Sequence, residues 1–326
     1  MKTLVIGDPH FKTSNIQEID RFVVGLKELI DNELSDITNI VMLGDLLHEH
    51  ERLHVTPLNK AYDFIRMLAN IAPTYCLVGN HDLINNRQFL STNHWMNAMK
   101  QWDNVTIIDK PVIVDTYLFV PYVPPSRFLD AIAGLDWMSC DCIFAHQEFK
   151  GCKMGAIISE EGDSWDADNP FVISGHIHSN QWVGNNIYYP GACMQHAFGE
   201  SEHNVIAVFN RECCNKDSIT EYDLKLPRKR IIYKDVTDDL DVEVGTDQIK
   251  LALTGNPEQF KSFRKTSQYK KLIKKGVKIT YKYKKTKDDI VDREDILNTS
   301  SFESVLKDLV DNQKLDLQTE YKQVMS

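Results

Sequence analysis

The sequence predicts an α/β protein with a smaller second unit, and three observations support this. Short apolar runs alternate with amphipathic helical patterns up to about residue 227. The longest of these runs have strand length, which is too short for a membrane span. Beyond residue 227 the chain becomes rich in lysine and a new pattern begins. With 326 residues, 42% of them hydrophobic, the chain is long enough to bury a sizeable core.

Each apolar run of the first part predicts a buried strand. Residues 3–8 (TLVIGD) and 39–45 (NIVMLGD) predict the first two. Apolar side chains at helical spacing predict a helix between them. A second helix is expected to begin at Thr56–Pro57, because proline fits the first turn of a helix. Further strands are expected at residues 73–82 (PTYCLVGNHD), 141–146 (DCIFAH) and 170–178 (PFVISGHIH).

A small β-α-β unit is expected at residues 228–288. Residues 247–256 and 277–284 alternate apolar and polar side chains, as strands do. One helix is expected between them, beginning at Asn256–Pro257 and ending at Gly276. Its apolar anchors would be Phe260, Phe263, Leu272 and Ile273. The last segment, 289–326, contains an amphipathic helix that either docks on its own chain or binds a partner.

Charge is unevenly distributed along the chain. The formal net charge is −10, yet residues 258–287 hold twelve Lys or Arg and one acidic residue, a net +11 that leaves −21 for the rest. Such asymmetry indicates a polyanionic partner or, alternatively, a solvated lysine-rich face. Seven cysteines without a regular spacing favour reduced thiols in the cytoplasm. The N-terminus runs directly into a strand, so no secretory signal is expected.

Polar motifs follow the predicted strands at five places. The motifs GDPH, GD, GNHD, FAH and GHIH supply carboxylate, amide and imidazole side chains where strands end, and loops at the carboxyl ends of strands are where α/β proteins gather ligands. Mixed oxygen and nitrogen ligands suit Mn²⁺, Fe²⁺ or Zn²⁺ better than Mg²⁺. Seven such side chains can hold two metal ions with one bridging carboxylate, an arrangement suited to in-line attack at phosphorus. The candidates are Asp8, His10, Asp45, Asn80, His146, His176 and His178.

The order of these motifs resembles the calcineurin-like metallophosphoesterase superfamily over about residues 1–210. The resemblance implies a two-sheet sandwich flanked by helices (αββα). It also implies that Asp45 bridges two metals, that His81 steadies the phosphate and that His81 protonates the departing oxygen. One metal would be held by Asp8, His10, Asp45 and His178, and the other by Asp45, Asn80, His146 and His176.

The residue three positions after Asp45 separates the branches of this superfamily. Protein phosphatases of this fold usually read GDxVDRG and GNHE, and cyclic-nucleotide phosphodiesterases usually carry Asp where this chain has His48. GDLLH is similar to SbcD, the nuclease subunit of the SbcCD double-strand-break repair complex, and to phage recombination nucleases. The later YYPGACMQHAFGE is also similar, although Ala192–Cys193 departs from the usual Gly-Ser. His48 would then contact the substrate phosphate, whereas His50 and His54 are expected to be loop or helix-entry residues.

The resemblance implies a dinuclear-metal DNA nuclease with Mn²⁺-dependent 3′→5′ exonuclease and endonuclease activity. Residues 1–227 would form the nuclease domain, 228–288 a basic DNA-capping domain and 289–326 a helical segment that binds an SbcC-type coiled-coil ATPase. A homodimer without membrane association is expected, in the cytoplasm of a cell or of a viral host. Lysines of the basic segment and its last strand together would follow the DNA backbone: Lys270, Lys271, Lys274, Lys275, Lys278, Lys282 and Lys284.

Two other functions remain open from the sequence. One is a metal-dependent phosphatase or nucleotide phosphodiesterase that acts on a small molecule. The basic unit and His48 argue against this function. A non-catalytic DNA-binding or assembly subunit is the third possibility. It is disfavoured because every expected ligand and the expected acid, His81, are present.

Overall fold

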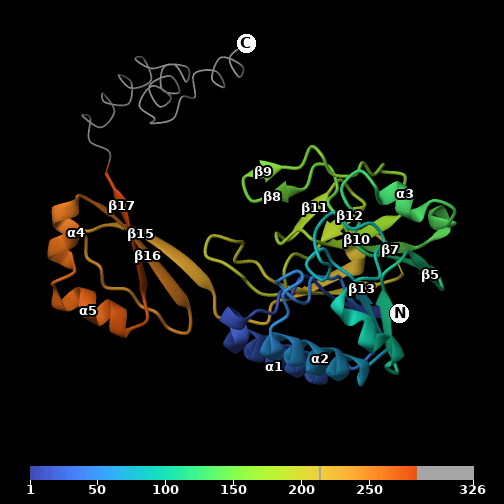
Figure 1. Cartoon of the computed structure of the whole chain (residues 1–326), viewed down its shortest axis with the longest axis horizontal. Helices are drawn as coiled ribbons and strands as arrows, with labels where there is room; N and C mark the ends of the chain where they lie inside the picture. Colours follow the sequence, from blue (N-terminus) through green and yellow to red (C-terminus); the bar gives the residue numbers. More distant parts are fainter. Residues whose placement is uncertain (213, 285–326) are drawn as a thin grey trace, which may run out of the picture. The chain divides into compact units, whose positions relative to one another are not determined.

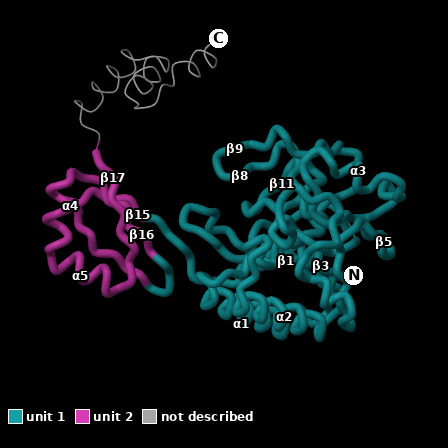
Figure 2. Tube along the Cα trace, viewed as in Figure 1, with its two compact units in different colours: residues 1–231, 245–248 teal, residues 232–244, 249–326 magenta. Residues whose placement is uncertain are grey.

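The computed structural model describes residues 1–212 and 214–284 and divides into two compact units (Figure 2). Unit 1 comprises residues 1–231 and 245–248, and unit 2 contains residues 232–244 and the described residues from 249 on. The partner-binding segment expected at 289–326 lies outside the described residues. Within the described ranges, no helix is long and apolar enough to cross a membrane.

Two six-stranded mixed sheets form unit 1. The first has the order β14-β13-β1-β2-β3-β4, in which β1 to β4 run parallel and β13 runs antiparallel to β1. Its strands are β1 (Lys2–Ile6), β2 (Ile37–Met42), β3 (Thr74–Leu77), β4 (Val105–Ile108), β13 (Ile206–Asn210) and β14 (Ile219–Tyr222).

The second sheet has the order β11-β12-β10-β7-β6-β5, with β6, β7, β10 and β12 parallel. Its strands are β5 (Val112–Val114), β6 (Tyr117–Val120), β7 (Cys142–His146), β10 (Phe171–Gly175), β11 (Gln181–Val183) and β12 (Ile187–Tyr189). A short hairpin of β8 (Lys153–Met154) and β9 (Ile157–Ile158) forms a separate two-stranded sheet.

Helices cover the outer face of each sheet (Figure 1). The first sheet packs against α1 (Ile16–Glu33) and α2 (Val55–Ala69), and the second against α3 (Phe128–Ile132). Single-turn or short 3₁₀ helices complete unit 1: η1 (Thr13–Asn15), η2 (Trp95–Gln101), η3 (Trp137–Ser139) and η4 (Lys216–Ser218). The predicted sandwich of two sheets flanked by helices is confirmed.

The core of the sandwich follows from side-chain alternation along the strands. In β1, Val5 points to the second sheet and packs in the inner layer with Phe144, whereas Leu4 points outward to Phe22 of α1. Leu4, Val5, Phe22 and Phe144 are all fully buried, and each such large side chain contributes roughly 1.5–3 kcal/mol of hydrophobic stabilisation. Burial on both faces explains why the strands read as continuous apolar runs.

Unit 2 has two layers, a three-stranded sheet and two helices. The sheet order is β15-β16-β17, and β16 runs parallel to β17. The elements are β15 (Lys229–Asp235), β16 (Gln248–Gly255), α4 (Pro257–Phe263), α5 (Ser267–Lys274) and β17 (Lys278–Tyr283).

The single helix predicted in unit 2 is wrong, because α4 and α5 are separate helices. Asn256 caps α4, and the side chain of Thr266 accepts a hydrogen bond from the Tyr269 N–H at 3.1 Å, which starts α5 anew. The break rotates the second helix relative to the expected pattern. Ile273, a predicted anchor, is therefore 46% exposed, while Leu272 is buried.

Candidate metal centre

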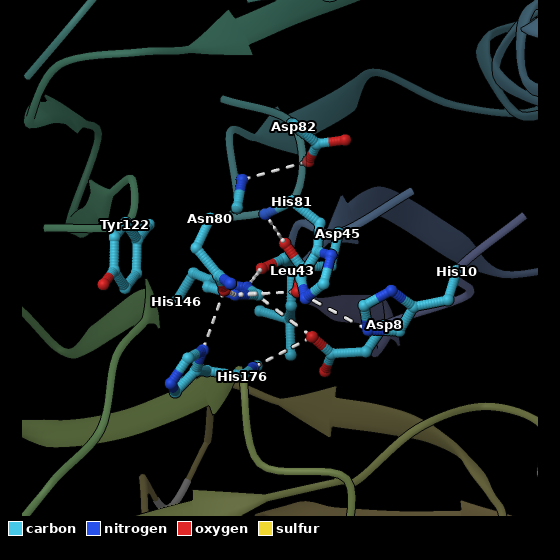
Figure 3. A network of polar contacts seen from close by, with 12 residues as sticks. Asp8, His10, Leu43, Asp45, Asn80, His81, Asp82, Tyr122, His146 and His176 are labelled. Atoms are coloured by element: carbon cyan, nitrogen blue, oxygen red, sulfur yellow. Dashed lines mark hydrogen bonds and ion pairs between the residues drawn. The ribbon is translucent and has the colours of Figure 1, made fainter. Parts of the chain in front are cut away.

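The carboxyl ends of the parallel strands of both sheets meet at one place, where the five motifs come together (Figure 3). Four of the seven predicted ligands have positive φ angles: Asp8 (40°), His10 (45°), Asp45 (50°) and His176 (76°). Residues other than glycine avoid this region, at a cost of the order of 1–3 kcal/mol each. Backbone strain at several residues whose side chains lie close together indicates a functional site.

One group of side chains is centred on His10. Its Nε2 lies 3.0 Å from Nε2 of His178 and 3.5 Å from Oδ2 of Asp45. Asp8 lies beside this group, and Asp8, His10 and Asp45 can direct ligand atoms to a common point. The structure thus brings together the four side chains predicted for the first metal.

A second group is centred on Asn80. Its Oδ1 lies 3.0 Å from Nε2 of His146 and 2.9 Å from Nδ1 of His176. The other ring nitrogen of His146, Nδ1, lies 2.7 Å from the carbonyl oxygen of Leu43 and carries the hydrogen, so Nε2 is the nitrogen left for a metal. These residues, with Asp45, are the four predicted for the second metal.

Asp45 lies between the two groups. Its Oδ2 is 3.5 Å from Nε2 of His10 and 3.4 Å from Nε2 of His146. The other oxygen, Oδ1, accepts a hydrogen bond from the backbone N–H of His81 at 2.8 Å. A Cβ at Gly79 would lie 2.2 Å from the same Oδ1, so only glycine fits there. The carboxylate is held in the orientation that a bridging ligand needs.

Charges in the centre favour a cation. Oδ2 of Asp8 is buried and has no hydrogen-bond partner among the described residues. Burial raises the pKa of Asp8 to about 6, with the Asp45 charge adding to the effect. Burial would lower the pKa of His146, but Asp45 and Asp8 outweigh it and raise that pKa to about 9. The negative charges of Asp8 and Asp45 that hold a proton on His146 also attract a divalent cation, so the residues fit a metal centre.

His81 lies at the rim of the centre. Its Nδ1–H donates to the backbone carbonyl of His48, so Nε2 is the ring nitrogen that this bond leaves available. Its ring stacks on His50 with centroids 4.5 Å apart, and on His48 at 5.3 Å. Burial lowers the pKa of His81. Because Nδ1–H is held by the carbonyl of His48, Nε2 can pass a proton to a neighbouring group only from the imidazolium form of the ring.

His48 also belongs to the centre, since its Nδ1 lies 3.3 Å from Nδ1 of His10. His50, expected to be an ordinary loop residue, has Nδ1 3.2 Å from the carbonyl oxygen of Leu83 and supports the His81 ring from the other side. His54 lies next to α2, 3.1 Å from Glu49, and takes no part in the centre.

Asp82 was not identified from the sequence. This buried carboxylate accepts hydrogen bonds from the backbone N–H of Gly79 at 3.0 Å, from that of Leu47 at 3.4 Å and from Nε1 of Trp95 at 2.9 Å. It thereby joins the loop that carries Asp45 to the loop that carries His81. Its position directly after GNH was the available signal.

Glu200 and His196 were also missed as site residues, although an acidic residue after the GHIH motif was noticed. Glu200 accepts hydrogen bonds from the backbone N–H of His196 at 2.7 Å and of Ala197 at 2.9 Å, and faces Nδ1 of His178 at 3.6 Å. Burial opposes its ionisation, but His178 and these N–H groups lower the pKa of Glu200 to about 2. Nε2 of His196 lies 2.8 Å from the carbonyl oxygen of Asp8. Both residues orient predicted ligands.

The calcineurin-like phosphoesterase family matches residues 1–209, from β1 into β13. The chain belongs to the calcineurin-like phosphoesterases. Members hydrolyse phosphoester bonds with divalent metals, and the carboxylate and imidazole groups described above are side chains that can hold such ions.

Similar proteins come from two invertebrate viruses. The "Putative phosphoesterase 244L" of Invertebrate iridescent virus 6 is 49% identical over 277 residues, which cover 81% of this chain and 97% of the relative. The "Putative phosphoesterase 078R" of Invertebrate iridescent virus 3 is 46% identical over 301 residues, which cover 87% of this chain and 85% of the relative. Among solved structures, the nuclease MPE of Pseudomonas putida matches with a TM-score of 0.32 and 12% identity. The matched region covers 64% of this chain and 84% of the nuclease chain.

The seven predicted DNA-binding lysines are exposed on unit 2, but they do not share one face. In the sheet, Ile279 and Tyr281 of β17 face the helices, so Lys278 and Lys282 point to the open face. Lysines of the helix layer lie on the opposite face: Lys270, Lys271, Lys274 and Lys275. The seven lysines therefore lie on two faces, and their contact with DNA stays a prediction. Ion pairs with Asp241 partly neutralise Lys271 and Lys275, and Lys284 pairs with Asp235 at 2.5 Å.

Proposed function

We propose that this calcineurin-like phosphoesterase is a DNA nuclease of the SbcD type, which hydrolyses phosphodiester bonds as a 3′→5′ exonuclease and an endonuclease. The observation that carries the proposal is the position of His10 between His178 and His48, at 3.0 and 3.3 Å. Through these contacts a row of imidazoles connects two openings on the surface of unit 1.

The openings lie on opposite ends of this row. A cavity of about 340 Å³ is lined by His176, His178 and Glu200, and an open groove is lined by His48, His50 and Arg52. A phosphodiester within a polymer has chain on both sides of the reacting phosphorus. Two openings that flank one centre suit such a substrate better than they suit a small phosphate ester, which needs a single pocket.

The side chains of the centre have distinct roles in the proposed reaction. Bound divalent ions, which we propose to be Mn²⁺, supply Lewis acidity and an activated water for attack at phosphorus. Asp45 holds the two ligand groups at a fixed separation. His48 directs a ring toward the place where the phosphate would lie. His81 keeps its Nδ1–H on the carbonyl of His48, and in its imidazolium form it also carries a proton on Nε2, which passes to the departing oxygen.

Unit 2 supports a nucleic acid as the substrate. The seven lysines predicted to bind DNA are exposed, and the stretch 258–287 carries a net +11 in a chain whose overall charge is −10. Lysine contacts to phosphates provide affinity that does not depend on base sequence and weakens with salt. We propose that the basic region 228–288 caps DNA held at the metal centre.

The remaining elements of the proposal concern assembly. Residues 289–326 would bind an SbcC-type coiled-coil ATPase, which admits DNA to the centre, and the chain would form a homodimer that acts in DNA repair or recombination. The relatives come from viruses, so we place this activity in the cytoplasm of an infected cell. Deleting 289–326 should remove ATPase binding in a pull-down assay and leave cleavage of small esters unchanged.

One experiment tests the nuclease function directly. The full-length chain with Mn²⁺ is incubated with end-labelled linear duplex DNA and, separately, with bis-p-nitrophenyl phosphate. We expect degradation of the DNA from its 3′ ends and loss of this activity in His81→Ala, with metal content near that of the native chain. Cleavage of the small diester without cleavage of any DNA, even with the ATPase present, would show a small-molecule phosphodiesterase instead.

A further inference from the structure

The hairpin β8–β9 exposes an unusual amount of apolar surface. Met154 is 39% exposed, Ile157 67% and Ile158 58%, within five consecutive residues. Their cross-strand partners bring them together, since Met154 pairs with Ile157. Single exposed apolar side chains are common, but a cluster on a projecting element marks a contact surface.

Hydrogen bonds tie the base of the hairpin to the second sheet. The side chain of Gln181, on β11, accepts a hydrogen bond from the Lys153 N–H at 2.7 Å and donates one to the Lys153 carbonyl at 2.9 Å. Below it, the Ser159 N–H donates to the Cys152 carbonyl at 2.8 Å, and the Gly151 N–H donates to the Ser159 carbonyl at 2.9 Å. At the tip, Gly155 has φ of +64° and no atom within 4 Å of where a Cβ would lie. The exposed apolar side chains thus lie on a hairpin whose base is hydrogen-bonded to β11.

The hairpin adjoins the metal centre. Lys153, Met154 and Gly155 line the same cavity of about 340 Å³ as His176 and His178. Figure 1 shows β8 and β9 beside β11, at the edge of the second sheet. A substrate bound in this opening would therefore contact the hairpin.

We propose that the β8–β9 hairpin is a wedge that packs against nucleobases next to the scissile phosphate and unstacks the end of a DNA duplex. The inference rests on the proposed nuclease function. A phosphate at the ligands places its neighbouring bases near the hairpin, and Met and Ile are side chains that proteins insert between base steps. Lys153, at the foot of the hairpin, is placed to contact an adjoining phosphate.

The size of the patch favours bases over a protein partner. Three apolar side chains and a lysine fall far short of the roughly 20–30 residues that each partner contributes to a stable protein interface. A wedge between two bases needs only one or two side chains. The hairpin also lines the cavity at the metal centre, so the molecule expected to contact it is the substrate of that centre.

The test compares the triple variant Met154→Ser/Ile157→Ser/Ile158→Ser with the native chain on three substrates. These are a blunt duplex, the same duplex with three unpaired bases at its 3′ end, and bis-p-nitrophenyl phosphate. We expect kcat/KM on the blunt duplex to fall about tenfold or more. The unpaired end should recover most of this loss, and the small diester should be unaffected. Leu129→Ser/Met138→Ser, which removes equally exposed apolar groups elsewhere on unit 1, is the matched control.

A second measurement follows base unstacking itself. A duplex carries 2-aminopurine as its terminal base and phosphorothioate linkages that slow cleavage. Native chain should raise the 2-aminopurine fluorescence, and the triple variant should raise it less. Equal cleavage of the blunt duplex by both proteins would overturn the wedge, as would an equal loss on all three substrates. A change of oligomeric state in light scattering would assign the patch to contact between copies. If the native chain cleaves the diester and no DNA, the proposed function itself fails.

Discussion

The carboxylate of Asp45 occupies the space that a side chain at Gly79 would need. A Cβ at Gly79 would lie 2.2 Å from Oδ1 of Asp45 and 2.4 Å from its backbone nitrogen. The backbone of Gly79 does not have a positive φ, so the requirement for glycine here is steric rather than conformational. The GD motif with Asp45 and the GNHD motif with Gly79 can thus pack closely only because Gly79 has no side chain.

Gly79→Ala is therefore expected to damage metal binding more than folding. The added methyl displaces Asp45 from the position between His10 and His146, and we expect Mn²⁺ affinity to fall about 10–100-fold, as it does when groups supporting a ligand are lost. Isothermal titration calorimetry measures this. Gly25→Ala in α1 is the control, because its nearest neighbour, Cβ of Leu224, lies 3.8 Å away. Unchanged Mn²⁺ affinity in Gly79→Ala would show that Asp45 does not bridge.

The role of His81 as proton donor is tested by changing the leaving group. A deoxyribose alkoxide needs a proton as it departs, whereas p-nitrophenolate is stable without one. His81→Ala should therefore lower kcat on DNA by about 10²–10⁴-fold and lower cleavage of bis-p-nitrophenyl phosphate much less. An equal loss on both substrates would instead indicate that His81 steadies the phosphate.

His48 and His50 contact His81 in different ways, and their substitutions should differ too. His48 is close to His10 and faces the open groove, so His48→Ala should raise KM for DNA while metal content stays near normal. His50 also lines this groove, but its Nδ1 lies at the carbonyl of Leu83 and its ring supports that of His81 at 4.5 Å, so His50→Ala should mainly lower kcat, by a few-fold. Steady-state kinetics on labelled duplex separates the two. The same effect from both substitutions would contradict this division.

The ligand set was accessible from the sequence because each motif follows an apolar run. Parallel strands bring their carboxyl ends to one edge, so Asp8 and Asp45 could be placed together without knowledge of the fold. Asp82 could not be assigned in this way. Its function depends on the N–H groups of Leu47 and Trp95, which come close only when three loops have packed.

The second unit shows a different kind of limit. The helical spacing of apolar side chains between residues 257 and 275 predicted one continuous helix. Thr266 is a local signal that the spacing does not show, because its side chain caps a second helix within this segment. The division of the lysines between two faces was implicit in the alternation of β17, since its apolar side chains must face the helices. The charge of the segment alone does not reveal it.

The two lysine faces of unit 2 should contribute unequally to DNA binding. On the open face of the sheet, Lys250 and Lys278 occupy directly opposed positions on neighbouring strands, and Lys282 continues the row. We expect Lys278→Glu/Lys282→Glu to weaken DNA binding and to reduce the salt slope by about 0.9 per lost phosphate contact. Lys270→Glu/Lys274→Glu makes the same change in net charge on the helix face and should have little effect. Fluorescence anisotropy at several salt concentrations measures both, and equal effects would indicate a general charge attraction.

Stability of the metal-free chain should fall below about pH 6.5, in part through His94. Burial lowers the pKa of His94 from its ordinary value of 6.5, despite the attraction of Asp109 at 3.3 Å, and Lys100 adds to the lowering. As pH falls through about 6.5, His94 becomes protonated in the unfolded chain but stays neutral in the folded chain. Protonation therefore favours the unfolded chain, and the free energy of unfolding decreases by at most about 1.4 kcal/mol per pH unit for this residue. Urea titrations in EDTA between pH 8 and 5 should give a shallower pH dependence for His94→Gln. Parallel curves for the two proteins would show that His94 titrates alike in both states.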